Sequence, residues 1–158
     1  MNHRILVFYG FYRSDRMGIR LAQFVVEGFR TRGDDVALID AKAVFLPMLE
    51  RMYKEYPRGE APQALEKVAG EIRAADGFVF NTGEYNWGVQ PGLKNLTYHF
   101  LEEWFWRPAA IASYSAGRFS GAREGGRALQ GAFRRFADDL TWWVEAAKVQ
   151  RARKQPPY

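Results

Sequence analysis

The sequence predicts an α/β domain built on a doubly wound parallel sheet, and two observations lead to that prediction. Continuous apolar runs of strand length alternate along the chain with longer stretches whose apolar residues recur at helical spacing. Such alternation is typical of parallel strands joined by right-handed helical crossovers, with helices covering both faces of the sheet. The 158 residues contain no internal repeat or low-complexity linker, so we expect a single domain over residues 1–158.

The first half of the chain supplies two strands and one helix to this prediction. Residues 4–9 (RILVFY) are almost continuously apolar, which is typical of a strand buried on both faces. Apolar residues at helical spacing predict a helix over 19–29, and residues 36–40 are interpreted as the second strand. Prolines and a glycine predict a long irregular connection over 43–60, with a helical turn between 49 and 56.

The second half continues the alternation. An amphipathic helix is predicted over 64–75 and a third strand over 77–81. A proline opens the next predicted helix, 91–104, at a position where its missing N–H costs nothing. The fourth strand is predicted over 108–114, and after a Gly- and Arg-rich loop the remainder to about 154 is predicted to be helical.

Composition excludes several classes of function. The chain has no cysteine and only two histidines, so we expect no disulfide, no thiol chemistry and no metal site. No apolar run approaches the roughly 20 residues that span a bilayer, and the N-terminus lacks signal-peptide architecture, so we expect a cytoplasmic protein without a membrane partner. The net charge of +5 is spread along the chain and into the tail 151–154, which favours solubility and steering over a nucleic-acid partner.

Three unusual loops follow the carboxyl ends of predicted strands, which is where ligands bind in open parallel sheets. The first, residues 10–18, leads into a helix N-terminus and suits a phosphate, with Arg13 and Arg16 adding charge and Ser14 a hydroxyl. It matches neither the dinucleotide-binding fingerprint nor the P-loop, and a solvated turn is the alternative interpretation.

The second loop, residues 82–92, has the composition of a site for a planar ring. Gly83 and Gly88 allow the backbone to approach a ligand closely, and Tyr85 and Trp87 offer flat apolar walls. Glu84 is either a general base or, as is commoner for a loop acid, a solvated turn residue.

The third loop, residues 113–123, contains serines but no nucleophile-elbow motif, so we reject acyl transfer. Two carboxylate pairs, Glu102-Glu103 and Asp138-Asp139, are adjacent in sequence and do not face each other on a helix. Glycosidic chemistry is therefore not expected either.

Together, the three loops resemble those of the NADPH-dependent FMN reductase family. The stretch "TGEYNWGVQPGLKN" is similar to the family's T-P-E-Y-N-x-x-x-P-G-x-L-K-N segment, and "SYSAGRFSGAR" to its S-x-S-x-G-R-x-G-G-x-R loop. "GFYRSDRMGIRLA" is a looser match to the G-S-x-R loop that holds the FMN phosphate. The resemblance covers residues 4–125.

This resemblance implies a flavodoxin-like three-layer sandwich with parallel strand order 2-1-3-4, numbering the strands along the chain. It also implies FMN as cofactor and NADPH (or NADH) as electron donor, with hydride passing through the flavin to a small-molecule acceptor such as a quinone, free flavin or metal oxyanion. The flavin carries the chemistry, so no side chain is assigned a catalytic role. A homodimer or homotetramer with the flavin near the subunit interface is expected.

The residues that the resemblance assigns to FMN lie in the three loops. Arg118 is also a candidate for the phosphate of NADPH. The phosphate loop comprises Gly10, Phe11, Tyr12, Arg13, Ser14, Arg16 and Gly18; the ring is lined by Gly83, Glu84, Tyr85, Asn86 and Trp87, and on its other side by Ser115, Ala116, Gly117 and Arg118.

The sequence also departs from the family pattern. Phe11 and Arg16 stand where the family has serines, and Gly83 replaces a proline. The usual fourth helix and fifth strand are missing, because the segment 136–150 already resembles the family's last helix. An alternative is a short strand over 140–144, but helical spacing favours helix. These departures motivate a second hypothesis, a flavin-binding or interaction domain without efficient turnover.

Overall fold

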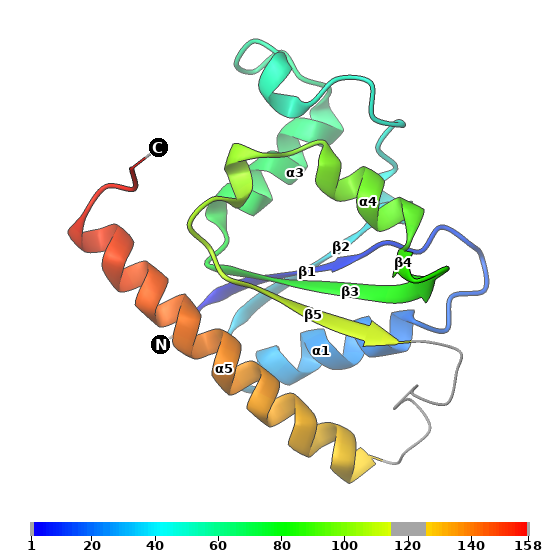
Figure 1. Ribbon diagram of the computed structural model, residues 1–158, viewed down its shortest axis with the longest axis vertical. Coiled ribbons are helices and arrows are strands. Elements are labelled where there is room, and N and C mark those ends of the chain that lie inside the picture. Colours follow the sequence, from blue (N-terminus) through cyan, green and yellow to red (C-terminus); the bar gives the residue numbers. More distant parts are fainter. Residues whose placement is uncertain (1, 115–125, 158) are drawn as a thin grey trace.

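A parallel sheet of four strands forms the centre of the computed structural model, which describes residues 2–114 and 126–157. The strands lie in the order β2-β1-β3-β5 (Figure 1). This is the predicted order 2-1-3-4, which is therefore confirmed; the label β5 arises because a two-residue strand, β4 (Gly88–Val89), intervenes in the chain. The four parallel strands are β1 (Arg4–Tyr9), β2 (Asp35–Asp40), β3 (Gly77–Tyr85) and β5 (Ala109–Tyr114).

Helices cover both faces of the sheet. In Figure 1, α1 (Ile19–Thr31) and α5 (Gly126–Arg153) lie on one face, and α3 (Gln63–Ala74) and α4 (Pro91–Tyr98) on the other. Alternate residues of β1 pack into different layers: Val7 joins the core beneath α1 and α5, whereas Phe8 joins the core beneath α3 and α4. The predicted three-layer arrangement is confirmed.

The connection between β2 and α3 contains two short helices. The first, α2 (Ala41–Val44), was not anticipated; it is capped by the Asp40 carboxylate, which accepts a hydrogen bond from the N–H of Lys42 at 3.0 Å. The second is the 3₁₀ turn η1 (Tyr53–Glu55), which lies within the predicted helical turn.

The prediction that the helix opened by Pro91 reaches Trp104 is wrong. Helix α4 ends at Tyr98, and a separate 3₁₀ turn, η2 (Glu102–Trp104), follows. The Trp104 ring packs against Phe8 and Phe78, with centroid distances of 5.3 and 5.1 Å, and its Nε1–H donates to the carbonyl of Phe100. The contacts of this partly buried indole with the core favour the separate turn over a continued helix.

Helix α5 spans 28 residues and includes the segment 140–144, so the preference for helix there is confirmed. Leu140 and Val144 point into the core beneath α1. No fifth parallel strand occurs in residues 2–114 or 126–157, and β5 forms an edge of the sheet there. None of the helices in these ranges is both long and apolar enough to cross a membrane.

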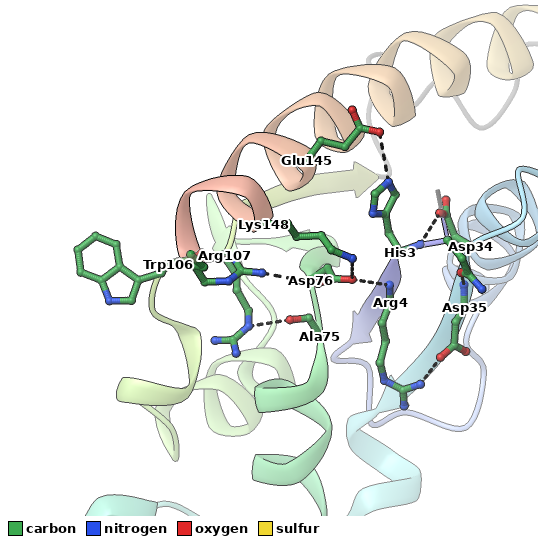
Figure 2. A network of polar contacts seen from close by, with 12 residues as sticks. His3, Arg4, Asp34, Asp35, Ala75, Asp76, Trp106, Arg107, Glu145 and Lys148 are labelled. Atoms are coloured by element: carbon green, nitrogen blue, oxygen red, sulfur yellow. Dashed lines mark hydrogen bonds and ion pairs between the residues drawn. The ribbon is translucent and has the colours of Figure 1, made fainter. Parts of the chain in front are cut away.

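A polar network ties the C-terminal half of α5 to the amino ends of the strands, at the edge of the sheet opposite the predicted ligand loops. Figure 2 shows Lys148 and the backbone N–H of Arg4 converging on one oxygen of Asp76, at 2.8 and 3.0 Å. Nearby, His3 Nε2 lies 3.5 Å from the carboxylate of Glu145. These contacts join α5 directly to the residues at the amino ends of β1 and β3.

Candidate functional site

Two of the three predicted ligand loops meet at the carboxyl edge of the sheet. Strands β1, β3 and β5 are parallel and in register, with Tyr9 beside Asn81 and Gly83 beside Tyr114. Their carboxyl ends therefore lie together, at the position where parallel sheets bind ligands. The third loop begins directly after Tyr114, and its predicted site residues Ser115, Ala116, Gly117 and Arg118 lie outside the described residues.

The predicted loop over residues 82–92 begins as a β-hairpin. Strand β3 continues to Tyr85, turns at Asn86 and Trp87, and pairs antiparallel with β4, Glu84 opposite Val89. Both turn residues have positive φ, 48° and 62°, which is the geometry of a tight two-residue hairpin turn. The Trp87 side chain is consequently held out in solvent, 95% exposed.

Gly83 lies close to two neighbouring side chains. A Cβ at this position would lie 2.7 Å from Nε2 of Gln90 and 2.8 Å from the ring of Tyr114. The missing side chain therefore makes room for Tyr114 and Gln90. Gly88 differs, because a Cβ there would meet only the Tyr85 carbonyl at 3.5 Å.

Tyr114 links the elements of this edge. Its hydroxyl accepts a hydrogen bond from Nε2 of the buried Gln90 at 3.1 Å and lies where a Cβ on Gly18 would be, at the N-terminus of α1. Burial, and then the neighbouring Tyr114 hydroxyl, raise the pKa of Tyr9 well above its ordinary value. Sequence reasoning missed Tyr114, although its position at the end of a predicted strand marked it as a candidate.

The loop between β1 and α1 packs on its neighbours partly through backbone. A Cβ on Gly10 would collide with the backbone of Leu93 in α4, so only glycine allows this contact. The Phe11 ring makes an edge contact with Tyr85, centroids 5.9 Å apart, and thereby joins the loop to the hairpin. Tyr12 lies beside Gly92 of α4.

The charges of this loop differ in their surroundings. Arg13 and Ser14 are exposed, whereas Arg16 pairs with Asp40 at the end of β2 at 2.5 Å and lies 5.6 Å from the centre of the Tyr9 ring. The Asp40 carboxylate offsets the Arg16 charge. Arg13 is therefore the more available cation for an anionic ligand.

A pocket of about 480 Å³ lies between the hairpin and the end of β5. Residues 82–84, 87–89 and 113–114 line it, so it includes the predicted Gly83, Glu84 and Trp87 but not Tyr85 or Asn86. Its volume is within the roughly 300–1,000 Å³ of small-molecule sites. Its lining combines backbone polar groups with two aromatic side chains, which suits the edge and face of a planar heterocycle.

The Asn81 side chain near this edge lacks hydrogen-bond partners, which favours a polar ligand or partner close to it. Asn81 is fully buried, and neither its Oδ1 nor its Nδ2 has a hydrogen-bond partner among the described residues. A buried amide of this kind is costly unless it is satisfied. Within residues 2–114 and 126–157 no group of three or more acidic or histidine side chains is arranged to hold a metal.

The comparisons with known proteins place the chain among flavin reductases. The model of the NADPH-dependent FMN reductase family matches residues 3–132. An NAD(P)H-dependent FMN reductase from Schizosaccharomyces pombe is 34% identical over 118 residues, which cover 70% of this chain and 57% of that protein. One from Pseudomonas aeruginosa is 41% identical over 71 residues, covering 39% and 36%. The chain thus spans about half the length or less of these relatives.

Solved structures share the fold. The flavoenzyme NAD(P)H:(acceptor) oxidoreductase FerB from Paracoccus denitrificans superposes with a TM-score of 0.69 at 16% identity, covering 92% of this chain and 98% of that one. An NAD(P)H:quinone oxidoreductase from Methanothermobacter marburgensis gives a TM-score of 0.56 at 15% identity, covering 90% and 79%. At these identities the likeness concerns the fold alone.

Proposed function

Because the chain belongs to the NADPH-dependent FMN reductase family, we propose that it is an FMN-dependent NAD(P)H oxidoreductase. Its acceptor is a small molecule such as a quinone, free flavin or metal oxyanion, and NADPH or NADH is the donor. The observation that carries the proposal is the pocket of about 480 Å³ at the carboxyl edge of the sheet, next to a helix N-terminus.

The residues present fit FMN. The loop 10–18, with the exposed Arg13 and Ser14, would hold the phosphate, and the hairpin residues 83–87 would line the isoalloxazine. Trp87 provides a flat wall that is free to pack on a ring, and Tyr114 is the second aromatic residue of the lining. Ser115 to Arg118 remain further candidates for contacts with the ring and the NADPH phosphate.

Bound FMN would supply the hydride-transfer chemistry. The contribution of the chain is to bind and orient the ring: backbone groups of the hairpin offer hydrogen bonds to its polar edge, and the aromatic walls keep water from its faces. No side chain of the described site is assigned proton transfer. We further propose that the protein acts as a homodimer or homotetramer.

The test is to add FMN to the purified protein, desalt it, and record the visible spectrum before and after anaerobic NADPH. We expect retained flavin absorbance that bleaches with NADPH and returns when a soluble quinone is added. Flavin that is retained but not reduced by NADPH or NADH would support a binding domain without turnover instead. A colourless protein would overturn the FMN site.

A matched pair of variants localises the ring. Trp87→Ala removes the proposed wall and should raise the Kd for FMN about tenfold, the upper range for one aromatic contact. Trp142→Ala removes an indole on α5 that is 61% exposed and should leave the Kd unchanged. Equal Kd values for the two variants would exclude Trp87 from the flavin site.

A further inference from the structure

The N-terminus of α1 has no side chain that balances its partial positive charge. The helix starts after Gly18, has no side-chain cap, and carries no acidic residue in its first turn. An anion is therefore favoured at this end of the helix. The loop of residues 10–18, which the proposed function assigns to the FMN phosphate, leads into the same end. The charged side chains of the loop then decide how strongly a phosphate is held.

Two arginines of this loop differ in what they contact. Arg13 is exposed and makes no ion pair with a described residue. The Arg16 guanidinium lies 2.5 Å from the Asp40 carboxylate and 5.6 Å from the centre of the Tyr9 ring. Both members of the Arg16–Asp40 pair are shielded from solvent, with side chains 23% and 13% exposed. Shielding strengthens an ion pair, so Asp40 offsets the charge of Arg16 as long as the two are in contact.

The backbone places this pair at the proposed phosphate site. The Arg16 carbonyl accepts a hydrogen bond from the N–H of Ile19, at 3.1 Å, in the turn that opens α1. Strands β1 and β2 are neighbours in the sheet (Figure 1), and Asp40, the last residue of β2, lies beside Tyr9, the last residue of β1. The cation of the pair therefore belongs to the loop, and the carboxylate belongs to the neighbouring strand.

The two partners are not equally free to move. The Asp40 carboxylate is held from a second side, because its Oδ1 accepts a hydrogen bond from the N–H of Lys42 at 3.0 Å. This bond caps α2 and does not involve Arg16. The Arg16 side chain has several rotatable bonds, and Asp40 is its one ion-pair partner among the described residues. An anion bound in the loop therefore draws Arg16 away and leaves Asp40 in place.

We propose that Asp40 competes with the flavin phosphate for Arg16, and thereby sets how strongly the site prefers FMN over riboflavin, which lacks the phosphate. This inference rests on the proposed function, which assigns residues 10–18 to the phosphate. Arg13 supplies a positive charge throughout, whereas Arg16 contributes only after it leaves Asp40. Asp40 is thus a specificity-determining residue that acts through Arg16 and does not touch the flavin. Its carboxylate lowers the affinity for FMN and leaves the affinity for riboflavin unchanged.

The test compares the Kd values of FMN and riboflavin, measured by changes in flavin fluorescence at about 0.15 M salt, where exposed charges more than about 8 Å apart are largely screened. Asp40→Asn removes the negative charge and keeps a residue that can cap α2. We expect it to lower the Kd for FMN about tenfold, the size of one charge-assisted hydrogen bond, with the Kd for riboflavin unchanged. Asp35→Asn is the matched control, because Asp35 pairs with Arg4 at the opposite end of β2; both Kd values should stay at the wild-type level.

A double-mutant cycle shows whether Asp40 acts through Arg16. In an Arg16→Ala background, Asp40→Asn should change the Kd for FMN by less than about twofold, because no guanidinium is left to release. An equal tightening with and without Arg16 would mean that Asp40 acts directly on the phosphate, and would overturn the proposal. An unchanged or raised Kd for FMN in Asp40→Asn would overturn it as well. Urea unfolding establishes that each variant is folded, and Asp40→Ser, which also caps a helix without a charge, takes the place of Asp40→Asn if that variant is not.

Inorganic phosphate separates this proposal from the proposed function. The urea midpoint of the full chain without flavin is measured against phosphate concentration, with chloride at equal ionic strength as the reference. The midpoint should rise more steeply with phosphate in Asp40→Asn than in the wild type, and only when Arg16 is present. If this holds but neither flavin binds, the proposed function fails and the competition for Arg16 stands. If FMN binds and Asp40→Asn behaves as the wild type in both assays, the proposed function stands and the competition is overturned; equal midpoints in a protein that binds no flavin overturn both.

Discussion

The same substitution, glycine to alanine, should have opposite effects on stability at Gly10 and at Gly70. A Cβ on Gly10 would overlap the backbone N and Cα of Leu93, at the first turn of α4. Backbone atoms cannot rotate away as a side chain would, so either β1 or α4 must shift. Gly70 lies exposed within α3, and a Cβ there meets no atom within 4 Å.

The expected magnitudes follow from these contacts. Overpacking typically costs about 1–3 kcal/mol, and the backbone contact places Gly10→Ala at about 3 kcal/mol of destabilisation. Gly70→Ala should stabilise the protein by about 0.5–1 kcal/mol, because alanine is the better helix residue at an unobstructed position. At this chain length the two variants should lower and raise the Tm by about 6–12 °C and 1–4 °C respectively.

Urea unfolding followed by far-ultraviolet circular dichroism measures both effects on one scale, with thermal unfolding as a second measure. Gly70→Ala also acts as the control for the chemistry of the substitution. If Gly10→Ala proved as stable as the wild type, the close packing of the first loop on α4 would be refuted. If both substitutions changed the free energy of unfolding in the same direction, the space around each glycine would not decide the sign of the effect, and the reasoning would be refuted.

Three further predictions concern polar groups that are buried or partly buried. Burial would raise the pKa of Asp76, but hydrogen bonds from Lys148 and the backbone N–H of Arg4 outweigh burial and hold that pKa below its usual value. The ionised Asp76 therefore stabilises the fold above about pH 4, and this stabilisation should be lost as the pH falls. Asp76→Asn should flatten the loss, measured by urea unfolding at about pH 2–4. Burial lowers the pKa of His99, so stability should also fall as the pH drops below about 6.5. A His99→Gln variant with the wild-type slope between about pH 6.5 and 5 would contradict this. Tyr114→Phe leaves Nε2 of the buried Gln90 without its acceptor and should cost about 1–3 kcal/mol in the same assay, whereas an unchanged midpoint would exclude the hydrogen bond.

The candidate site was only partly accessible from sequence. Loops at the carboxyl ends of strands pointed to the edge where the pocket of the hairpin lies, because parallel strands must end together. The hairpin was missed since its turn residues, Asn86 and Trp87, are not the usual Asn-Gly pair, and tryptophan rarely takes a positive φ. The pairing of Arg16 with Asp40 joins residues 24 positions apart and has no local signal.

The layers of this protein follow from patterns that are local in the sequence. Apolar runs of strand length and apolar residues at helical spacing are local patterns, and the early start of the last helix predicted that the fourth helix and fifth strand are missing. How the carboxyl ends of the strands pack together depends on contacts between residues that are distant in the sequence. The Trp104 ring in η2 packs against Phe78 of β3, a strand far away in the chain. The Tyr114 side chain reaches Gly18 and Gln90 in neighbouring elements. Such contacts depend on which side chains the folded sheet brings together, and local periodicity carries no information about them.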